Sequence, residues 1–154
     1  MRADFINPFL KACLNVLTTM AHIQAVPGKP YTKQEKLAEG DVTGMIGLVG
    51  NKAKGSMAIT FSESSILYIA SKMLGEQQVQ LDETIADLVG EITNMVTGGA
   101  KKELTDNGYK FEMAIPSTIM GRKHVTSHST KAPIIVVPFS TEEGDFFLEV
   151  CMEE

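Results

Sequence analysis

The longest regular pattern of apolar and polar positions runs from Asp82 to about Thr105. Within it, apolar residues recur at steps of three and four, which is the spacing of one face of an α-helix. These positions are Ile85, Leu88, Val89, Ile92, Met95, Val96 and Ala100. Asp82 is a good N-cap and Asn107-Gly108 a good stop signal. The segment therefore predicts one long amphipathic helix.

Shorter patterns predict one more long helix, one short helix and seven candidate strands. The first helix begins near Asp4 or Asn7-Pro8 and ends at the loop that Val26 opens. Ser62 caps the short helix and Gly75 ends it. The candidate strands cover about residues 31–38, 42–49, 56–61, 109–115, 123–129, 134–139 and 146–152. Turn residues at 39–41, 51–55 and 142–145 predict hairpins, and 116–121 is predicted to be a loop.

The order of these elements indicates a doubled unit, because a helix followed by strands occurs twice along the chain. Residue identity between the halves is too low to establish a repeat from the sequence. The pattern predicts an α+β fold, in which a mostly antiparallel sheet of about six strands carries two long helices and a short one. No linker interrupts the sequence, so residues 1–154 are expected to form a single domain.

Composition and charge narrow the possible partners. The formal net charge is −5, so the chain lacks the cationic surface with which proteins bind nucleic acid. No run of apolar residues is long enough to span a bilayer, and the N-terminal apolar stretch is interrupted by Asp4 and Lys11, as expected of a docked helix. Cys13 and Cys151 show no motif spacing, which favours free thiols in a reducing cytoplasm.

A polar ridge lies on the side of the long helix opposite its apolar arc. Asp87, Glu91 and Asn94 are spaced i, i+4 and i+7, Gly98 continues the row, and Lys101 flanks its end. No His, Cys or Ser is placed to form a nucleophile–base pair. A carboxamide cannot act as a base, but it can hold a water or a carbonyl by hydrogen bonds, which suits phosphoryl chemistry. The alternative is an ordinary solvated helix face.

The residues around this ridge resemble a known family. Residues 90–95 read GEITNM on a helix opened by Leu81-Asp82-Glu83, which is similar to the catalytic helix of the CheC/CheX/FliY phosphatases. The signature of that family is Asp or Ser, three residues, Glu, two residues and Asn. The resemblance continues at residues 28–30, 47–50, 55–56 and 116–122. It covers nearly the whole chain and is strongest to the CheX branch of the family.

The resemblance implies a CheC-like fold and an enzyme that hydrolyses the aspartyl phosphate of a phosphorylated CheY-type response regulator. Asn94 would orient the attacking water, and Glu91 would pair with the active-site lysine of the regulator. Asp87, Gly98 and Lys101 are expected to bind the partner. The chain would need no cofactor, with Mg²⁺ expected only in the response regulator. The resemblance also implies a homodimer formed through sheet edges.

The first helix is expected to be structural. It carries Lys11, Ala12 and Asn15 and has no Glu three residues before an Asn, which predicts one site per chain. Two other functions stay open from the sequence. One is a non-catalytic module that binds a response regulator or part of the flagellar switch, and the other is a small-ligand sensor that uses the Met-rich interior.

Two further patterns contain residue types that occur in binding sites. His124 and His128 would share one face of a predicted strand, but no third ligand of matching type lies nearby, so no metal site is predicted. Gly44, Gly47 and Gly50 in the second predicted strand indicate bulges or close packing instead of a cradle for a ligand.

Overall fold

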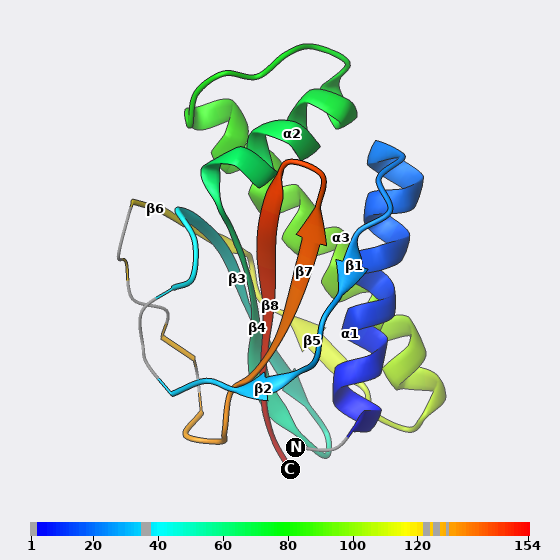
Figure 1. The fold of residues 1–154 in the computed structure, drawn as a ribbon. Helices are drawn as coiled ribbons and strands as arrows, with labels where there is room; N and C mark the ends of the chain where they lie inside the picture. Colours follow the sequence, from blue (N-terminus) through cyan, green and yellow to red (C-terminus); the bar gives the residue numbers. More distant parts are fainter. Residues whose placement is uncertain (1–2, 35–37, 122–123, 125–126, 129) are drawn as a thin grey trace.

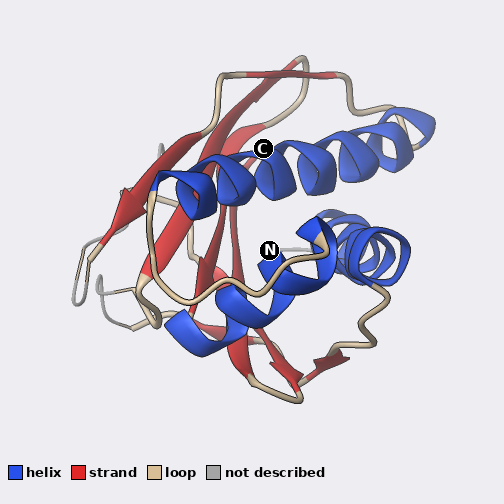
Figure 2. Cartoon of the chain, turned by 90° about the horizontal axis from the view of Figure 1, so that it is seen from above, coloured by secondary structure: helices blue, strands red, loops and turns tan. Residues whose placement is uncertain are grey.

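Helices cover one face of an antiparallel sheet in the computed structural model of the chain (Figures 1 and 2), which describes residues 3–34, 38–121, 124, 127–128 and 130–154. The helices are α1 (Ala3–Val16), α2 (Glu63–Leu74) and α3 (Glu83–Asp106), and a π-helical turn, Leu17–Ala21, extends α1. Within these ranges, none of the helices has the length and apolar character needed to cross a bilayer.

The sheet contains eight strands among the described residues, and all of their pairings are antiparallel. They are β1 (Val26–Pro27), β2 (Tyr31–Thr32), β3 (Val42–Gly50), β4 (Lys54–Phe61), β5 (Phe111–Met113), β6 (Ser117–Met120), β7 (Ile135–Thr141) and β8 (Gly144–Glu153). Their order is β1-β7-β8-β4-β3-β5, with β2 also on β7 and β6 also on β3. The predicted α+β class is confirmed, with eight strands in place of about six.

The strand pairings confirm the doubled unit. Each half contributes a long helix, two short strands and a long hairpin. The short strands of the first half, β1 and β2, pair with β7, and those of the second half, β5 and β6, pair with β3. The two hairpins meet at the centre, where β4 pairs with β8. Each half therefore completes the sheet of the other.

The structure corrects the predicted strand over 31–38. Among its described residues only Tyr31 and Thr32 form a strand, and β2 pairs with β7 instead of forming a hairpin with β3. Residues 35–37 lie outside the described part of the chain. The partner strand is more than a hundred residues away in sequence, as the pairing of Tyr31 with Val136 shows, so local turn residues do not encode it.

The region after α3 also differs from the prediction. The predicted strand over 109–115 is shortened to β5, and the predicted loop over 116–121 contains β6, which pairs with β3. Pro116 and Gly121 flank β6 and mark its ends, and Gly121 has a φ of 129°. The predicted strand over 123–129 lies largely outside the described residues, and its described members, 124, 127 and 128, are not in a strand.

The first helix ends earlier than predicted. The π-helical turn stops at His22, whose φ of 56° is left-handed. The segment around Val26 forms the edge strand β1 instead of a loop. The hydrophobic core then fills the space between helices and sheet. Its largest fully buried side chains include Phe5, Phe9, Phe61, Phe139 and Phe146.

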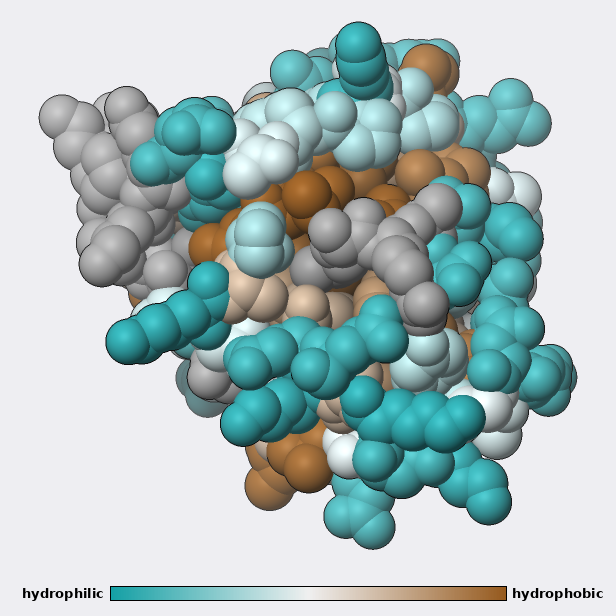
Figure 3. Space-filling view, turned by 90° about the horizontal axis from the view of Figure 1, so that it is seen from below, coloured by the Kyte–Doolittle hydropathy of each residue, from teal (hydrophilic) through white to brown (hydrophobic). Residues whose placement is uncertain are grey.

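Several large apolar side chains on the strands or next to them are exposed. Val26 on β1 is 64% exposed, Val49 on β3 is 67% exposed, and Ile115 between β5 and β6 is 91% exposed. Figure 3 views the end of the molecule where β2 and the β3–β4 turn lie, and there hydrophilic residues surround a central band of hydrophobic ones.

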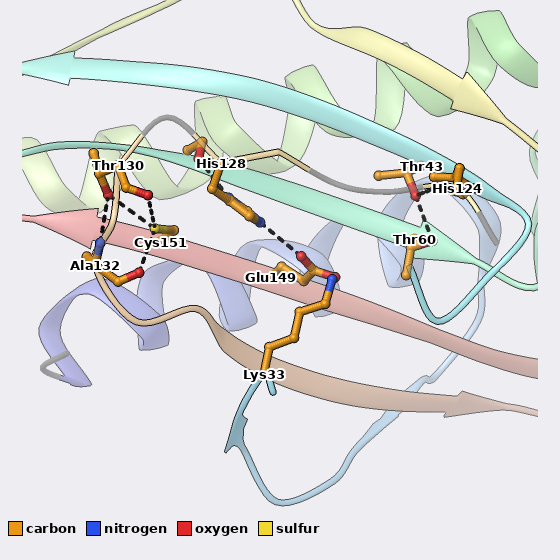
Figure 4. A network of polar contacts seen from close by, with 10 residues as sticks. Lys33, Thr43, Thr60, His124, His128, Thr130, Ala132, Glu149 and Cys151 are labelled. Atoms are coloured by element: carbon orange, nitrogen blue, oxygen red, sulfur yellow. Dashed lines mark hydrogen bonds and ion pairs between the residues drawn. The ribbon is translucent and has the colours of Figure 1, made fainter. Parts of the chain in front are cut away.

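A buried polar network occupies the face of the sheet that points away from the helices (Figure 4). The Glu149 carboxylate on β8 accepts hydrogen bonds from Lys33 Nζ at 2.8 Å and lies 2.9 Å from His128 Nε2. His128 Nδ1 lies 2.7 Å from the Ser56 hydroxyl. Because burying a lone charge is unfavourable, the three ionisable side chains hold one another in place.

Candidate functional site: the outer ridge of helix α3

Helix α3 is fixed at both ends by its caps. The Asp82 carboxylate accepts a hydrogen bond from the Ile85 N–H at 3.1 Å, and the backbone N–H of Asn107 closes the last turn. One face of the helix is buried, through Ile85, Val89, Ile92, Thr93, Val96, Thr97, Ala100 and Leu104. The N-cap and the periodicity therefore act as predicted, and the opposite face of α3 is left to solvent.

The predicted site residues lie on that opposite face. We call Asp87, Glu91, Asn94 and Gly98 the α3 ridge. Asp87, Glu91 and Gly98 are exposed, and Asn94 is half-buried. Their spacing places them on one row along the helix, so the structure brings all four together on one surface. Lys101, half-buried, follows about one turn beyond Gly98 and two turns beyond Asn94.

The polar atoms of the α3 ridge are available to a partner. Among the described residues, none forms a hydrogen bond or an ion pair with the side chains of Asp87, Glu91 or Asn94. In the same part of the chain, no buried side-chain nitrogen or oxygen lacks a hydrogen-bond partner. The unpartnered carboxamide of Asn94 therefore reaches solvent, although the residue is half-buried.

Strand β6 lies along one side of the α3 ridge. The Thr118 hydroxyl donates a hydrogen bond to the Ala86 carbonyl at 3.3 Å, and a Cβ added at Gly90 would lie 3.7 Å from the same hydroxyl oxygen. Ala86, Gly90 and Asn94 occupy one row at i, i+4 and i+8. Asn94 thus lies on the side of the ridge nearest the β5–β6 segment, whereas Glu91 lies further toward solvent.

Gly98 keeps the far end of the ridge flat. A Cβ added there would meet no atom within 4 Å among the described residues, so packing within the chain does not require a glycine. A helix-interior glycine is unfavourable by about 1 kcal/mol relative to alanine. The absence of a side chain instead leaves room for another backbone to approach the helix.

Helix α1 carries no equivalent ridge. Its buried residues Phe5, Phe9, Ala12, Cys13 and Val16 have the same spacing as Val89, Thr93, Val96, Thr97 and Ala100 of α3. With the two helices aligned in this way, Asn7 corresponds to Glu91 and Leu10 to Asn94. Leu10 packs against the core. The carboxylate and the carboxamide are thus present on one of the two long helices.

His124 and His128 contact different groups. His124 lies within hydrogen-bond distance of the Thr43 hydroxyl and the Gly121 carbonyl, and His128 lies between Ser56 and Glu149 (Figure 4). In the described part of the chain, no group of three or more His, Cys, Asp or Glu side chains is arranged to hold a metal ion.

The sequence reasoning missed the network of Lys33, His128 and Glu149. Burial alone would raise the pKa of Glu149, but hydrogen bonds from His128 and Lys33 and the charge of Lys33 lower it below the ordinary value. A carboxylate with a lowered pKa stabilises the fold above its unfolded pKa, and this contribution is lost as the pH falls through the folded pKa. The available signal was a single acidic residue inside the apolar stretch FFLEVCM.

The sheet, the helices on one of its faces and the outward polar ridge together define a CheC-like α+β protein. The family model described as chemotaxis phosphatase CheX matches residues 42–140, and the chain belongs to this family. The membership confirms the resemblance seen in the sequence and the expected class of enzyme, a phosphatase.

Similar proteins extend over the whole chain. A CheC-like superfamily protein from Shewanella sp. PV-4 is 52% identical, with a TM-score of 0.94 and 100% of both chains covered. The CheY-P phosphatase CheX of Thermotoga maritima is 26% identical over 97% of both sequences. CheX in the CheX–CheY–BeF3–Mg²⁺ complex of Borrelia burgdorferi is 28% identical, with a TM-score of 0.83, 99% of this chain and 100% of that chain covered.

Proposed function

We propose that this chain hydrolyses the aspartyl phosphate of a CheY-type response regulator by inserting Glu91 and Asn94 into the active site of its partner. The observation that carries the proposal is an unpartnered carboxamide, one turn from an exposed carboxylate, on the outward face of a helix in a CheX-family chain. The relative from Thermotoga maritima, named a CheY-P phosphatase, and the CheX–CheY complex of Borrelia burgdorferi support the same partner class.

In the proposed reaction a water attacks the phosphorus, a new phosphorus–oxygen bond forms, and the bond to the aspartyl oxygen breaks. The aspartate leaves as a carboxylate, and the water proton passes to a phosphate oxygen or to solvent. Asn94 holds the water in line with the breaking bond by hydrogen bonds, since an amide takes up no proton. A hundredfold acceleration corresponds to about 2.7 kcal/mol, a modest demand on one well-placed side chain.

The other residues of the ridge bind the partner in this proposal. Glu91 pairs with the active-site lysine of the regulator and anchors the helix, and Asp87 lies one turn away at the rim of the same contact. Gly98 allows close approach of the partner backbone, and Lys101 meets acidic groups around the phosphorylation site. The metal ion of the reaction, Mg²⁺, belongs to the regulator.

The decisive experiment follows the phosphoryl lifetime of a CheY-type receiver domain charged with acetyl phosphate and Mg²⁺. Wild-type chain shortens the lifetime, and Asn94→Ala abolishes the effect while the chain stays folded. Asn107→Ala is a matched control, because this asparagine is exposed at the other end of α3 and closes the helix through its backbone. If the wild type binds the receiver but leaves its lifetime unchanged, the chain is a binding module and the catalytic proposal is wrong.

We also propose that two copies associate through the sheet edges in the cytoplasm. The edges are formed by short strands next to exposed apolar side chains, Val26 on one side and Ile115 on the other. Unpaired strand edges of this kind readily pair with another chain. Sedimentation of the wild type should give a dimer, and Ile115→Asp or Val26→Asp should identify the edge that forms it. A monomer at micromolar concentration would contradict this proposal.

A further inference from the structure

Helix α3 approaches strand β3 without room for a side chain at Gly44. A Cβ added at Gly44 would overlap the Thr93 hydroxyl and would lie 3.0 Å from Val89 Cγ1 and 3.2 Å from Thr93 Cβ. Contacts of this kind force the neighbouring atoms to move, because side chains and backbone in a packed core have little free space. Gly44 therefore fixes how closely the helix lies against the sheet.

The atoms above Gly44 are held by hydrogen bonds and cannot turn away freely. Thr93 is fully buried, and its hydroxyl donates to the Val89 carbonyl at 2.7 Å. Thr97, one turn further, donates to the Thr93 carbonyl at 2.7 Å. A larger residue at position 44 would contact this hydrogen-bonded turn of α3, so the whole helix would have to shift.

A second contact holds the helix from the side. Thr118 of β6 is the register partner of Gly44 on β3, and its hydroxyl donates to the Ala86 carbonyl at 3.3 Å. We call Gly44, Thr93 and Thr118 the α3 seat. Its three members come from β3, α3 and β6. Together they set how close α3 lies to the sheet and how the helix is rotated about its axis.

We propose that the α3 seat positions the α3 ridge for catalysis. Thr93 immediately precedes Asn94, and a rigid helix transmits any displacement at the seat to the carboxamide. This inference rests on the proposed phosphatase function. Alignment of the water is more sensitive to displacement than docking is, since a misplacement of about 1 Å lowers catalytic rates about a hundredfold. The seat residues are positioning residues and do not touch the substrate.

The test compares kcat and KM for release of inorganic phosphate from the acetyl-phosphate-charged receiver domain. Gly44→Ala should lower kcat roughly tenfold or more and change KM by less than about threefold, as expected for loss of alignment with docking retained. Gly47→Ala is the matched control on the same strand, since a Cβ there would make an ordinary 3.9 Å contact with Ala114. It should keep both constants.

Two further variants separate positioning from loss of fold. Gly44→Ala/Thr93→Ala removes the overlapping hydroxyl and should regain part of the lost kcat, because the 3.0 Å contact with Val89 Cγ1 and the 3.2 Å contact with the Cβ of residue 93 remain. Thr118→Val keeps the side-chain volume, loses the hydrogen bond to Ala86, and should lower kcat by a smaller factor than Gly44→Ala. All variants are compared at temperatures below their melting points.

The outcomes separate the two proposals. If Asn94→Ala is as active as the wild type, the proposed function is wrong. If Asn94→Ala is inactive but folded Gly44→Ala and Thr118→Val keep the wild-type kcat, the function stands and the positioning proposal is overturned. An equal loss in Gly44→Ala and in the double variant would also contradict it, because relief of the overlap should restore part of the rate.

Discussion

Helices α1 and α3 occupy equivalent places in the two halves of the fold, but they differ on their outer faces. Both bury residues at matching positions against the sheet. On the outside, α3 presents Glu91 and Asn94, whereas α1 has Asn7 and Leu10 at those positions. The core pattern is therefore shared by the two halves of the doubled unit, whereas the outward residues differ, and the proposed chemistry depends on those outward residues.

The largest change in the free energy of unfolding is expected at Phe9 of α1, whose place in the core corresponds to that of Thr93 in α3. Phe9→Ala should lower the free energy of unfolding by about 4 kcal/mol, because it removes a fully buried aromatic ring. Thr93→Ala should cost about 1 kcal/mol, since its hydroxyl bonds its own helix. Urea denaturation of both variants measures the difference. Equal losses would show that the two positions do not have the packing that the structure describes.

Exchanging Leu10 of α1 and Asn94 of α3 tests whether the outer faces of the two helices differ in function. Asn94→Leu should lower kcat about a hundredfold, or about 2.7 kcal/mol, and Leu10→Asn should leave kcat unchanged. Phosphate release from the charged receiver domain gives both values. A gain of hydrolysis in Leu10→Asn combined with Asn94→Ala would mean that α1 can also reach the partner, and that the missing carboxamide alone keeps α1 from acting as a second site. Full hydrolysis in Asn94→Leu alone would contradict the one-site interpretation.

The N-cap of α3 provides a test of intermediate size. Asp82→Ala removes the hydrogen bond to the Ile85 N–H and should cost about 1 kcal/mol. Asp82→Asn retains an acceptor and should cost much less. The melting temperatures of the two variants separate the cap from the loss of a charge, and a large loss in both would assign the effect to charge.

The smallest expected effect lies where the two helices meet. Lys11 of α1 and Glu103 of α3 form an exposed ion pair at 3.2 Å. Lys11→Ala should change the free energy of unfolding by less than about 0.5 kcal/mol, because water and salt screen such pairs. Chemical denaturation at low and high salt checks this value. A larger, salt-dependent loss would show that the pair contributes to holding the helices together.

The sequence predicted those parts of the fold that local patterns encode. The caps Ser62, Gly75 and Asp82, and the α3 helix itself, follow from periodicity and capping, and the structure confirms them. The pairing of β2 with β7 joins residues far apart in sequence, so no local pattern encodes it. The four residues of β6 were too few, between Pro116 and Gly121, to show a strand pattern.

The residues of the candidate site could be predicted from the sequence, but the packing that holds them in place could be predicted only in part. The spacing of Asp87, Glu91 and Asn94 gave the ridge, and the resemblance gave its expected chemistry. A bulge or close packing was expected at Gly44 from its position in a strand, and the structure shows close packing. Its partner Thr93 was not predicted, because the approach of a helix to a strand is set by the whole core. The catalytic roles of Glu91 and Asn94 stay predictions until the variants are measured.

Strand β8 follows every other described element in the chain, yet it lies in the middle of the sheet, between β7 and β4. The hairpin of β3 and β4 is therefore synthesised long before the neighbour that covers its inner edge. While a ribosome makes the chain, that edge stays open and able to pair with the wrong strand. A stop codon before residue 144 would remove the strand that joins the β3–β4 hairpin to β7, so the two halves of the sheet would lose their connection.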